Sequence, residues 1–375
     1  MLRSLTYGFI ALVLAGTVAA CTSSTALLNN GTGVGPNFST GTLYASNSTQ
    51  NSISIYAVSP SNGAAPLYQI GGASTGFNGP QYLAFDGLNN LWVTNFNSAT
   101  GAAQISIIKA LATGNVAPLQ AFNNGIGHPR AMAYSTKNSL MAVATTISGP
   151  LGSSDQVLFF GNQGGFTVSS QPLAGSNTGL SQPSGVAFDT NNNMYVANQG
   201  NASVEEFVVP TPTPTPAPTA TPTASPTPSP TPSPTATPPG ATATPSPTPM
   251  PTPVFNVAPM STIIGANTGL KSPAALAVDA TGLIYVADPG SSSIRIFTAG
   301  ASGNAFPVTV IAGNLTQLQS PTDVKVDGSG NIYVADAGAN KILVFVLNGA
   351  TGAQNIAPKS TIAVVGNVIG LGFSP

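Results

Sequence analysis

Few residues in this chain are of the types that carry out chemistry. Its 375 residues include one histidine, His128, one cysteine, Cys21, and only 9 basic and 10 acidic side chains. One histidine cannot form a multi-histidine zinc site, and any Ser-His-Asp triad would have to use it. The sequence contains no nucleophile elbow, phosphate-binding loop, dinucleotide fingerprint or calcium loop. We therefore predict no catalytic residue, no metal site and no cofactor.

Six of the acidic residues recur at two fixed places in an internal repeat. The first group directly follows the first apolar segment of a copy and consists of Asp86, Asp189, Asp279 and Asp327. The second group ends the second apolar segment and consists of Asp288 and Asp336. Aspartate carboxylates accept hydrogen bonds from nearby backbone N–H groups in turns. A side chain that returns at one position in successive copies usually serves the copy itself. We therefore expect these six residues to be structural turn caps.

Asp323 and Lys325 differ from this pattern, because they alternate along one face of a predicted strand. The other copies carry mostly small neutral residues at the matching places. Two interpretations stay open. The two charges form a local ion pair, which contributes little if it is exposed, or they contact a polar ligand together with Arg130. The single histidine, His128, is either incidental or a further ligand contact beside Arg130.

These residues are positioned by a repeat with a period of about 50 residues, the kind of period that indicates a repeat architecture. Copies begin at prolines 80, 129, 183, 273 and 321, and a shortened copy covers residues 42–58. The two clearest copies read PAALAVDATGLIYVADPGSSSIRIF and PTDVKVDGSGNIYVADAGANKILVF. Short segments rich in β-branched and aromatic residues alternate with turn signals, which predicts three strands. A fourth strand is expected after a recurrent Ala-Pro element.

The pattern resembles the NHL repeat, which forms one blade of a β-propeller. The resemblance implies an all-β fold, a six-bladed β-propeller with four-stranded blades over residues 41–375, with a seven-bladed ring as the alternative. The first copy lacks a well-formed first strand and Pro375 stands where another copy would begin, so we infer that the two ends of the chain share one blade. The resemblance also implies that the first strand of each copy lines a central channel, so Asp323 and Lys325 would face that channel. The aromatic position of the second strand is expected in the core, at Tyr44, Trp92, Tyr195, Tyr285 and Tyr333.

One spacing in the repeat is anomalous. Prolines 183 and 273 are 90 residues apart, and residues 210–253 between them hold 18 of the 34 prolines. Removing this 44-residue run shortens the spacing to 46 residues and restores the period. Alternating Thr-Pro and Ser-Pro favours polyproline II without internal hydrogen bonds. We interpret the run as a disordered insertion between the third and fourth strands of one blade.

The beginning of the chain has the features of an export signal. Residues 1–20 combine Arg3 with an apolar stretch that ends in Val18-Ala19-Ala20 and is followed by Cys21. This junction resembles the bacterial lipobox, in which the cysteine becomes the lipidated first residue. Residues 21–40 are rich in Ser, Thr, Asn and Gly and are expected to form a flexible tether. The expected location is the bacterial envelope, with the outer membrane favoured where two membranes exist because Thr22 is not aspartate.

The overall composition limits the function. Charged residues make up 5% of the chain and the net charge is −1, so we expect no nucleic-acid binding. We predict a lipid-anchored, non-enzymatic and monomeric binding scaffold for an envelope protein or glycan. Some propellers that resemble this one are lactonases or lyases that hold a divalent metal in the channel. A metal-dependent hydrolase or lyase at the channel mouth, with a channel divalent cation, is therefore the alternative.

Overall fold

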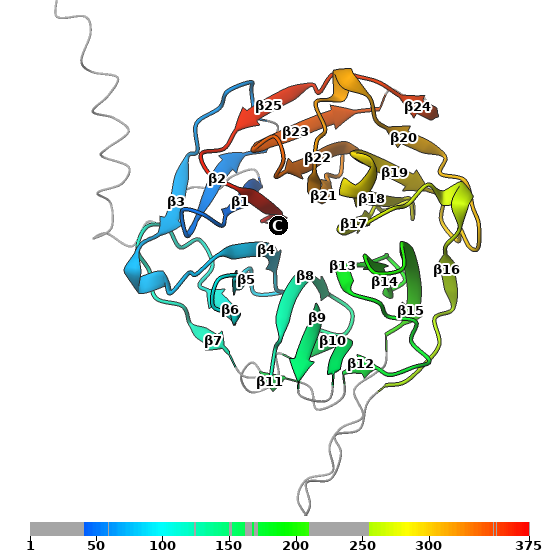
Figure 1. The fold of residues 1–375 in the computed structure, drawn as a ribbon. Coiled ribbons are helices and arrows are strands. Elements are labelled where there is room, and N and C mark those ends of the chain that lie inside the picture. Colours follow the sequence, from blue (N-terminus) through cyan, green and yellow to red (C-terminus); the bar gives the residue numbers. More distant parts are fainter. Residues whose placement is uncertain are drawn as a thin grey trace, which may run out of the picture.

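The computed structural model describes residues 41–58, 60–123, 125–149, 152–161, 167–168, 172–209, 255–347, 349 and 351–374. The export signal, Cys21, the tether and the insertion at 210–253 lie outside the described residues. The described part forms six sheets of mainly antiparallel strands around a central channel, which are the blades of a β-propeller (Figure 1). The predicted all-β six-bladed fold is confirmed.

The first three blades follow one another along the chain. Blade 1 consists of β26 (Val368–Phe373), β1 (Thr42–Asn47), β2 (Ser52–Ala57) and β3 (Tyr68–Gly71). Blade 2 consists of β4 (Pro80–Phe85), β5 (Leu91–Asn97), β6 (Ala102–Ile108) and β7 (Gln120–Phe122). Blade 3 consists of β8 (His128–Ser135), β9 (Leu140–Gly149), β10 (Gly152–Gly161), β11 (Thr167–Val168) and β12 (Leu173–Ala174).

The other three blades complete the ring. Blade 4 consists of β13 (Pro183–Phe188), β14 (Asn193–Asn198), β15 (Ser203–Val208) and β16 (Ser261–Ile263). Blade 5 consists of β17 (Ala275–Val278), β18 (Ile284–Asp288), β19 (Ser293–Phe297), β20 (Thr309–Ile311) and β24 (Gly352–Gln354). Blade 6 consists of β21 (Pro321–Val326), β22 (Asn331–Asp336), β23 (Lys341–Val346) and β25 (Ser360–Ala363). Strands β15 and β16, on either side of the proline-rich run, pair with each other.

The ring closes where the two ends of the chain meet in blade 1. The C-terminal strand β26 is the innermost strand of this blade and pairs antiparallel with β1, with Leu43 opposite Phe373. The Thr42 N–H donates to Ser374 Oγ at 3.0 Å, which fixes the junction. The expectation that the termini share a blade is confirmed, and the structure adds that the C-terminal end supplies the channel strand.

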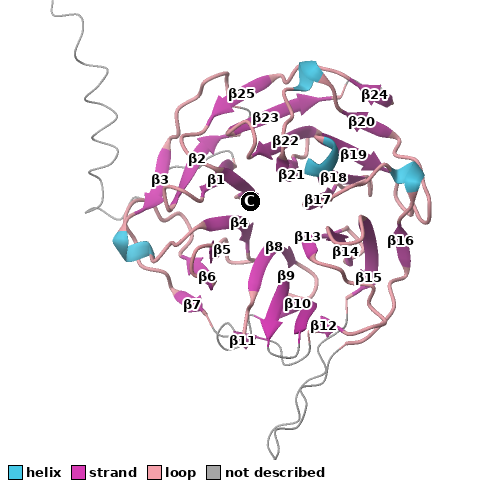
Figure 2. Cartoon of the chain, in the orientation of Figure 1, coloured by secondary structure: helices cyan, strands magenta, loops and turns pink. Residues whose placement is uncertain are grey.

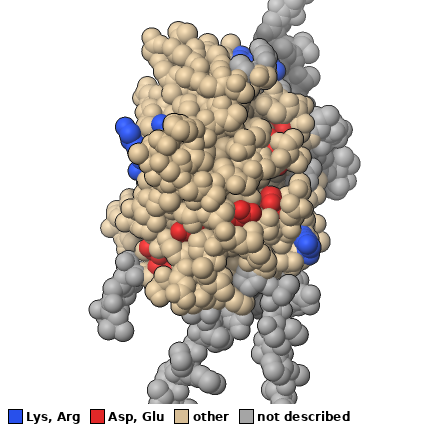
Figure 3. All heavy atoms as spheres, turned by 90° about the vertical axis from the view of Figure 1, so that its right-hand side faces the viewer, with Lys and Arg blue, Asp and Glu red and all other residues tan. Residues whose placement is uncertain are grey.

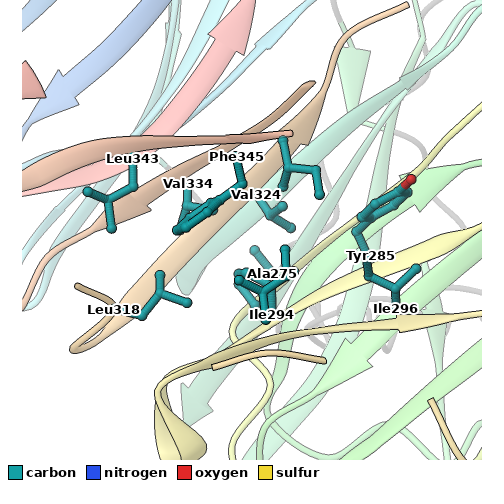
Figure 4. Packing of buried hydrophobic residues seen from close by; sticks show 12 residues of the cluster. Ala275, Tyr285, Ile294, Ile296, Leu318, Val324, Val334, Leu343 and Phe345 are labelled. Atoms are coloured by element: carbon teal, nitrogen blue, oxygen red, sulfur yellow. The ribbon is translucent and has the colours of Figure 1, made fainter. Parts of the chain in front are cut away.

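Apolar side chains fill the space between neighbouring blades. Between blades 5 and 6, Ala275 and Ile294 pack with Val324, Val334 and Phe345, all of them buried (Figure 4). The second-strand aromatic residues are buried as predicted, with Trp92 1% and Tyr333 0% exposed. Because each blade buries one side against each neighbour, no blade has a complete core of its own.

The outer edge of most blades is covered by a loop of the following blade, which the sequence pattern did not predict. In blade 1 the backbone of Gly114 pairs with Ile70 of β3, and Asn115 Oδ1 accepts the Ser74 N–H at 2.8 Å. Gly72 has a φ of 116°, and a Cβ there would lie 2.6 Å from Asn115 Oδ1, so the approach requires glycine. The equivalent contacts in other blades are made by Asn256, Asn304 and Asn355. Such pairing removes free strand edges that would otherwise aggregate.

Helical structure is limited to short 3₁₀ turns among the described residues. They are η1 (Ala73–Thr75), η2 (Ala266–Thr268), η3 (Pro289–Ser291) and η4 (Asn314–Thr316). The turns that follow the outermost strands lie at the rim of the disc (Figure 2). None of the helices in the described part of the chain is long and apolar enough to cross a membrane.

Candidate functional site

The first group of recurrent aspartates binds the turn between the first two strands of its blade. Asp86 Oδ1 accepts the N–H groups of Leu88 and Asn90, both at 2.9 Å, and its Oδ2 accepts Trp92 Nε1–H at 3.0 Å. Asp279 and Asp327 repeat this arrangement, with the hydroxyls of Tyr285 and Tyr333 in place of the indole, and Asp189 caps its turn through Asn193. One carboxylate thus orders a turn and satisfies the polar atom of a core aromatic side chain.

These hydrogen bonds also determine the ionisation of the capping groups. Partial burial acts to raise the pKa of Asp279, but hydrogen bonds from Thr281, Tyr285 and Leu283 outweigh it and hold the pKa below its ordinary value. The pKa of Asp327 is lowered in the same way. These carboxylates are charged near neutral pH and their lone pairs are largely occupied by the blade.

The second group of aspartates joins the end of the second strand to the loop that leads into the blade. Asp288 accepts the N–H groups of Lys271 and Ser272 at 3.1 and 2.8 Å. Asp336 accepts those of Gln319 and Ser320 at 2.8 and 3.0 Å. Both aspartates are fully buried, so they act as fixed acceptors inside the blade and do not reach the channel.

Asp323 and Lys325 do lie at the channel and contact each other. Lys325 Nζ is 2.7 Å from Asp323 Oδ1. Asp323 is 1% exposed, and its Oδ2 accepts the Leu371 N–H of β26 at 2.8 Å, so it links blade 6 to the closing strand. The side chain of Lys325 is 26% exposed. This is the geometry of the ion-pair interpretation, with the lysine still open to a ligand on one side.

Arg130 does not join this pair. It projects from blade 3, and its Nη1 donates to Gln199 Oε1 of blade 4 at 2.6 Å, while Gln199 Nε2 donates to Ser272 Oγ of blade 5 at 2.9 Å. The buried Nε of Arg130 has no hydrogen-bond partner in the described structure. The two charged positions that the sequence analysis grouped are therefore held by different blades, and the pKa of a third residue depends on both charges.

That third residue is Tyr82 on β4, which the sequence analysis treated only as a neutral match to Asp323. Burial raises the pKa of the Tyr82 phenol, the charge of Asp323 raises it further, and Arg130 acts in the opposite direction. Both charges therefore act on one phenol. The only sequence signal was a large aromatic residue at a first-strand position where most copies have a small one.

His128 lies at the start of β8 and packs against Phe96 of blade 2. The two rings are stacked, with centroids 3.6 Å apart and planes at 17°. Burial, followed by the charge of Arg130, lowers the pKa of His128 to about 4. The imidazole is therefore neutral at physiological pH.

The carboxylates that the repeat pattern left unexplained have different surroundings. Asp155 accepts Thr146 Oγ1–H and the Gln182 N–H at 2.7 and 2.8 Å. Glu205 is 3% exposed and its Oε2 has no hydrogen-bond partner among the described residues. Burial raises the pKa of Glu205 to about 7, although a hydrogen bond with Asn198 acts to lower it.

The channel has two dissimilar ends. We call the end where the innermost strands finish the turn mouth. It holds a cavity of about 540 Å³ whose walls include Asp86, Gly87 and Thr136 of the first turns. Its rim is formed by one equivalent residue from each of the six blades: Phe85, Tyr134, Phe188, Val278, Val326 and Phe373.

We call the opposite end, where the innermost strands begin, the entry mouth. A crevice of about 410 Å³ lies here between blades 1 and 2, near the point of ring closure. It is lined by the amide side chains of Asn51, Asn78, Gln81, Asn97 and Asn367 and by the apolar Phe96 and Ile369, with Ser, Thr and Gly between them. Among the described residues that line the crevice, none carries a charge.

The alternative function, a metal-dependent hydrolase or lyase, requires side chains that can bind a metal ion. Within the part of the chain that the structure describes, no three His, Cys, Asp or Glu side chains are grouped so that they could hold a metal ion.

Comparisons with known proteins agree with this architecture. Residues 318–345 match the NHL repeat. The chain is a six-bladed β-propeller that contains an NHL repeat. A search of curated protein sequences found no match to this chain.

Solved structures support the fold in the same way. The propeller resembles a chain of a nidogen–laminin complex, with a TM-score of 0.52, 13% identity, and coverage of 90% of this chain and 99% of that chain. It also resembles a putative 6-phosphogluconolactonase from Bacteroides fragilis, with a TM-score of 0.53, 12% identity, and coverage of 91% and 100%. A protein of unknown function from Bacteroides caccae gives a TM-score of 0.55 at 10% identity, with coverage of 90% and 99%. At these identities the likeness concerns the fold alone.

Proposed function

We propose that this protein is an exported, lipid-anchored and non-enzymatic β-propeller whose entry mouth binds a neutral envelope glycan. The uncharged crevice of about 410 Å³ between blades 1 and 2 carries this proposal. Primary amides both donate and accept hydrogen bonds, as sugar hydroxyls do. Phe96 adds an apolar ring to the crevice wall. A site built of amides and one aromatic ring suits a ligand that is rich in hydroxyls and has no charge.

The rest of the surface supports a neutral partner. Most of the side of the disc seen in Figure 3 carries neither basic nor acidic side chains. The whole chain has 9 basic and 10 acidic residues, and most of the acidic ones are engaged in the blades. Electrostatic attraction to a charged partner is therefore weak, and binding has to come from hydrogen bonds and shape.

The lipid anchor is supported by the sequence around Cys21, which follows Val18-Ala19-Ala20. Two or three acyl chains on one residue hold a protein at a membrane far better than a single chain does. Replacing Cys21 by serine is expected to move the protein from the membrane fraction to the soluble fraction of the envelope. Persistence of the Cys21→Ser variant in the membrane fraction after a salt wash would contradict the anchor.

The glycan site is tested with the chain from Thr22 onwards, which keeps every strand of the closed ring, on an array of neutral and charged envelope glycans. Gln81→Ala and Ser98→Trp change the crevice, and neither side chain has a hydrogen bond that holds the backbone in the described structure. Both variants should lose neutral-glycan binding. Ser329→Trp, an exposed residue in a first-to-second-strand turn of blade 6, is the matched control and should bind normally.

Several results would overturn the proposal. Wild-type protein that binds no glycan, but recovers an envelope protein through the same crevice, would move the site to a protein partner. Bound metal together with turnover of a lactone or ester would favour the hydrolase alternative.

A further inference from the structure

The turn mouth has the size of a small-molecule site. Its cavity of about 540 Å³ lies within the range of roughly 300–1,000 Å³ that is typical of ligand pockets. All six blades contribute to its walls, so its shape is fixed by the closed ring rather than by a loop. The cavity is on the opposite end of the channel from the glycan crevice, so the inference below does not depend on the proposed function.

The space exists because, in five blades, one position of the innermost strand carries a residue with a small side chain or none. The residues opposite the second-strand aromatic position are Ala84, Ala187, Ala277 and Gly372, with Ala133 in the blade that lacks the aromatic residue. Blade 6 alone has a long side chain there, Lys325, which is opposite Tyr333. The result is an apolar chamber with a single amine on its wall.

The amine is already neutralised by its neighbour. Lys325 Nζ is 2.7 Å from Asp323 Oδ1, and Asp323 is also held by the Leu371 N–H. The cavity wall also includes Asp86, which is 3% exposed and whose carboxylate accepts the N–H groups of Leu88 and Asn90. With one positive and two negative charges, the surroundings disfavour an additional anion. The ammonium nevertheless keeps donor capacity, because it has three N–H groups.

We propose that the turn mouth binds one neutral, apolar small molecule that carries a ketone or hydroxyl oxygen, and that Lys325 Nζ donates a hydrogen bond to this oxygen. The ring Phe85, Tyr134, Phe188, Val278, Val326 and Phe373 surrounds the apolar body of the ligand. Ala277 and its equivalents leave the room for it. The ligand is a neutral compound rather than a fatty acid, because a carboxylate would meet the charges of Asp323 and Asp86.

The experiment uses Prodan, a neutral dimethylamino-naphthyl ethyl ketone whose emission shifts to the blue in apolar surroundings. The chain from Thr22 onwards should bind one dye per molecule with a blue shift. The corresponding dimethylamino-naphthoate, with a carboxylate in place of the ketone, should bind at least roughly tenfold more weakly. Absence of saturable Prodan binding, or equal affinity for the two compounds, would overturn the proposal.

A matched pair of substitutions locates the dye. Ala277→Leu adds a side chain to the cavity wall and should weaken Prodan binding by more than roughly tenfold. Ala280→Leu makes the same change at an exposed residue three positions away, outside the cavity, and should leave binding unchanged. Thermal unfolding of each variant shows whether the ring is intact. If Ala277→Leu is unfolded, Ala187→Leu repeats the test from blade 4, and equal binding by the cavity and control variants refutes the site.

The role of the amine needs a variant that leaves no unpaired buried carboxylate. The double variant Asp323→Asn with Lys325→Met removes both charges together. It should bind Prodan roughly tenfold more weakly, the factor for one hydrogen bond to a charged donor, and should still prefer the ketone over the carboxylate, because the apolar wall and Asp86 remain. Unchanged affinity for Prodan would show that Lys325 does not contact the ligand.

Discussion

Blades 4 and 5 place opposite charges at one position of the third strand. Glu205 lies opposite Val196 in blade 4, and Arg295 lies opposite Val286 in blade 5. At the end of the second strand, blade 4 has Asn198 and blade 5 has Asp288. The arginine is therefore next to a carboxylate, 3.6 Å from Asp288 Oδ2, whereas the glutamate is next to a neutral amide.

The comparison shows that the repeat requires a hydrogen-bond acceptor at the end of the second strand but does not fix its charge. In both blades the residue at the end of the second strand accepts backbone N–H groups of the entering loop, a role that either Asn or Asp fills. The neighbouring third-strand residue then has to suit the charge of that acceptor. In blade 5 the positive Arg295 lies beside the negative Asp288. In blade 4 the acidic Glu205 lies beside the neutral Asn198, and Glu205 Oε2 has no hydrogen-bond partner among the described residues. Four changes test this account.

The largest effect is expected from Asn198→Asp. The change places a second carboxylate beside buried Glu205 and should cost about 3–5 kcal/mol of unfolding free energy at pH 8. Urea denaturation at pH 8 measures the cost. Asn95→Asp is the matched control, because Asn95 has the same place in blade 2 and its amide contacts Ser106 Oγ rather than a glutamate. Equal losses in the two variants would show that Glu205 is not the cause.

The second test is the pH dependence that Glu205 adds. Its pKa is about 7 in the folded protein and has an ordinary value of 4.5, so the folded state binds this proton more tightly. The stabilisation is complete below pH 4.5 and is lost as the pH rises through 7, a total of about 3 kcal/mol. Glu205→Gln should therefore be more stable than wild type at pH 8, and this advantage should shrink toward pH 4.5. Parallel denaturation curves of the two proteins across this range, with a constant difference, would contradict the raised pKa.

The third test concerns the glycine packed against the glutamate. Gly179 has a φ of 71°, and a Cβ there would clash with Glu205 Oε1. Gly179→Ala should lower the free energy of unfolding by about 2–3 kcal/mol, of which about 1–2 kcal/mol comes from placing a Cβ on a left-handed backbone. Gly63→Ala measures the backbone part alone, since its φ is 67° and nothing lies within 4 Å. Combining Gly179→Ala with Glu205→Ala should remove the excess cost, and a persistent excess would place the clash elsewhere.

The smallest effect is expected from Arg295→Leu. Blade 6 shows that the buried aspartate does not need an arginine, because Leu343 has the equivalent place and Asp336 is satisfied by the N–H groups of Gln319, Ser320 and Ala339. Asp288 keeps the N–H groups of Lys271 and Ser272, so its charge stays compensated, and the variant should lose less than about 1 kcal/mol of unfolding free energy in urea denaturation. A loss of several kcal/mol would mean that the blade 5 ion pair is essential, and the blade 6 comparison would fail.

The sequence was sufficient for the architecture because each blade repeats the same physical solution. Alternating apolar residues, an Asp turn and an aromatic residue predicted the strands, and the resemblance of six copies to the NHL repeat implied six blades. Of the fourth strands expected after the recurrent Ala-Pro element, two appear as β16 and β25. The ring closure was predicted from the incomplete first and last copies, but which end supplies the inner strand depends on how β26 fits beside β1.

The candidate site was predicted less completely. Asp323 and Lys325 were found because they depart from the repeat pattern, and their contact follows from their spacing on one strand. Tyr82 and Gln199 were missed, because the effect of Asp323 on the pKa of Tyr82 and the hydrogen bond between Arg130 and Gln199 join different blades, and no sequence spacing encodes such distances. The residues that line the two mouths were missed for the same reason, since each lining is built from more than one blade.

The sequence by itself determined the local structure: where strands begin and end, which turns need aspartate, and which side chains are buried within a blade. These properties depend on neighbouring residues and on the period-two alternation of a strand. Only the tertiary structure decided which charges meet, which carboxyl group is left without a partner, and where the channel widens. Those properties depend on distances between blades, and these distances are set when the ring closes.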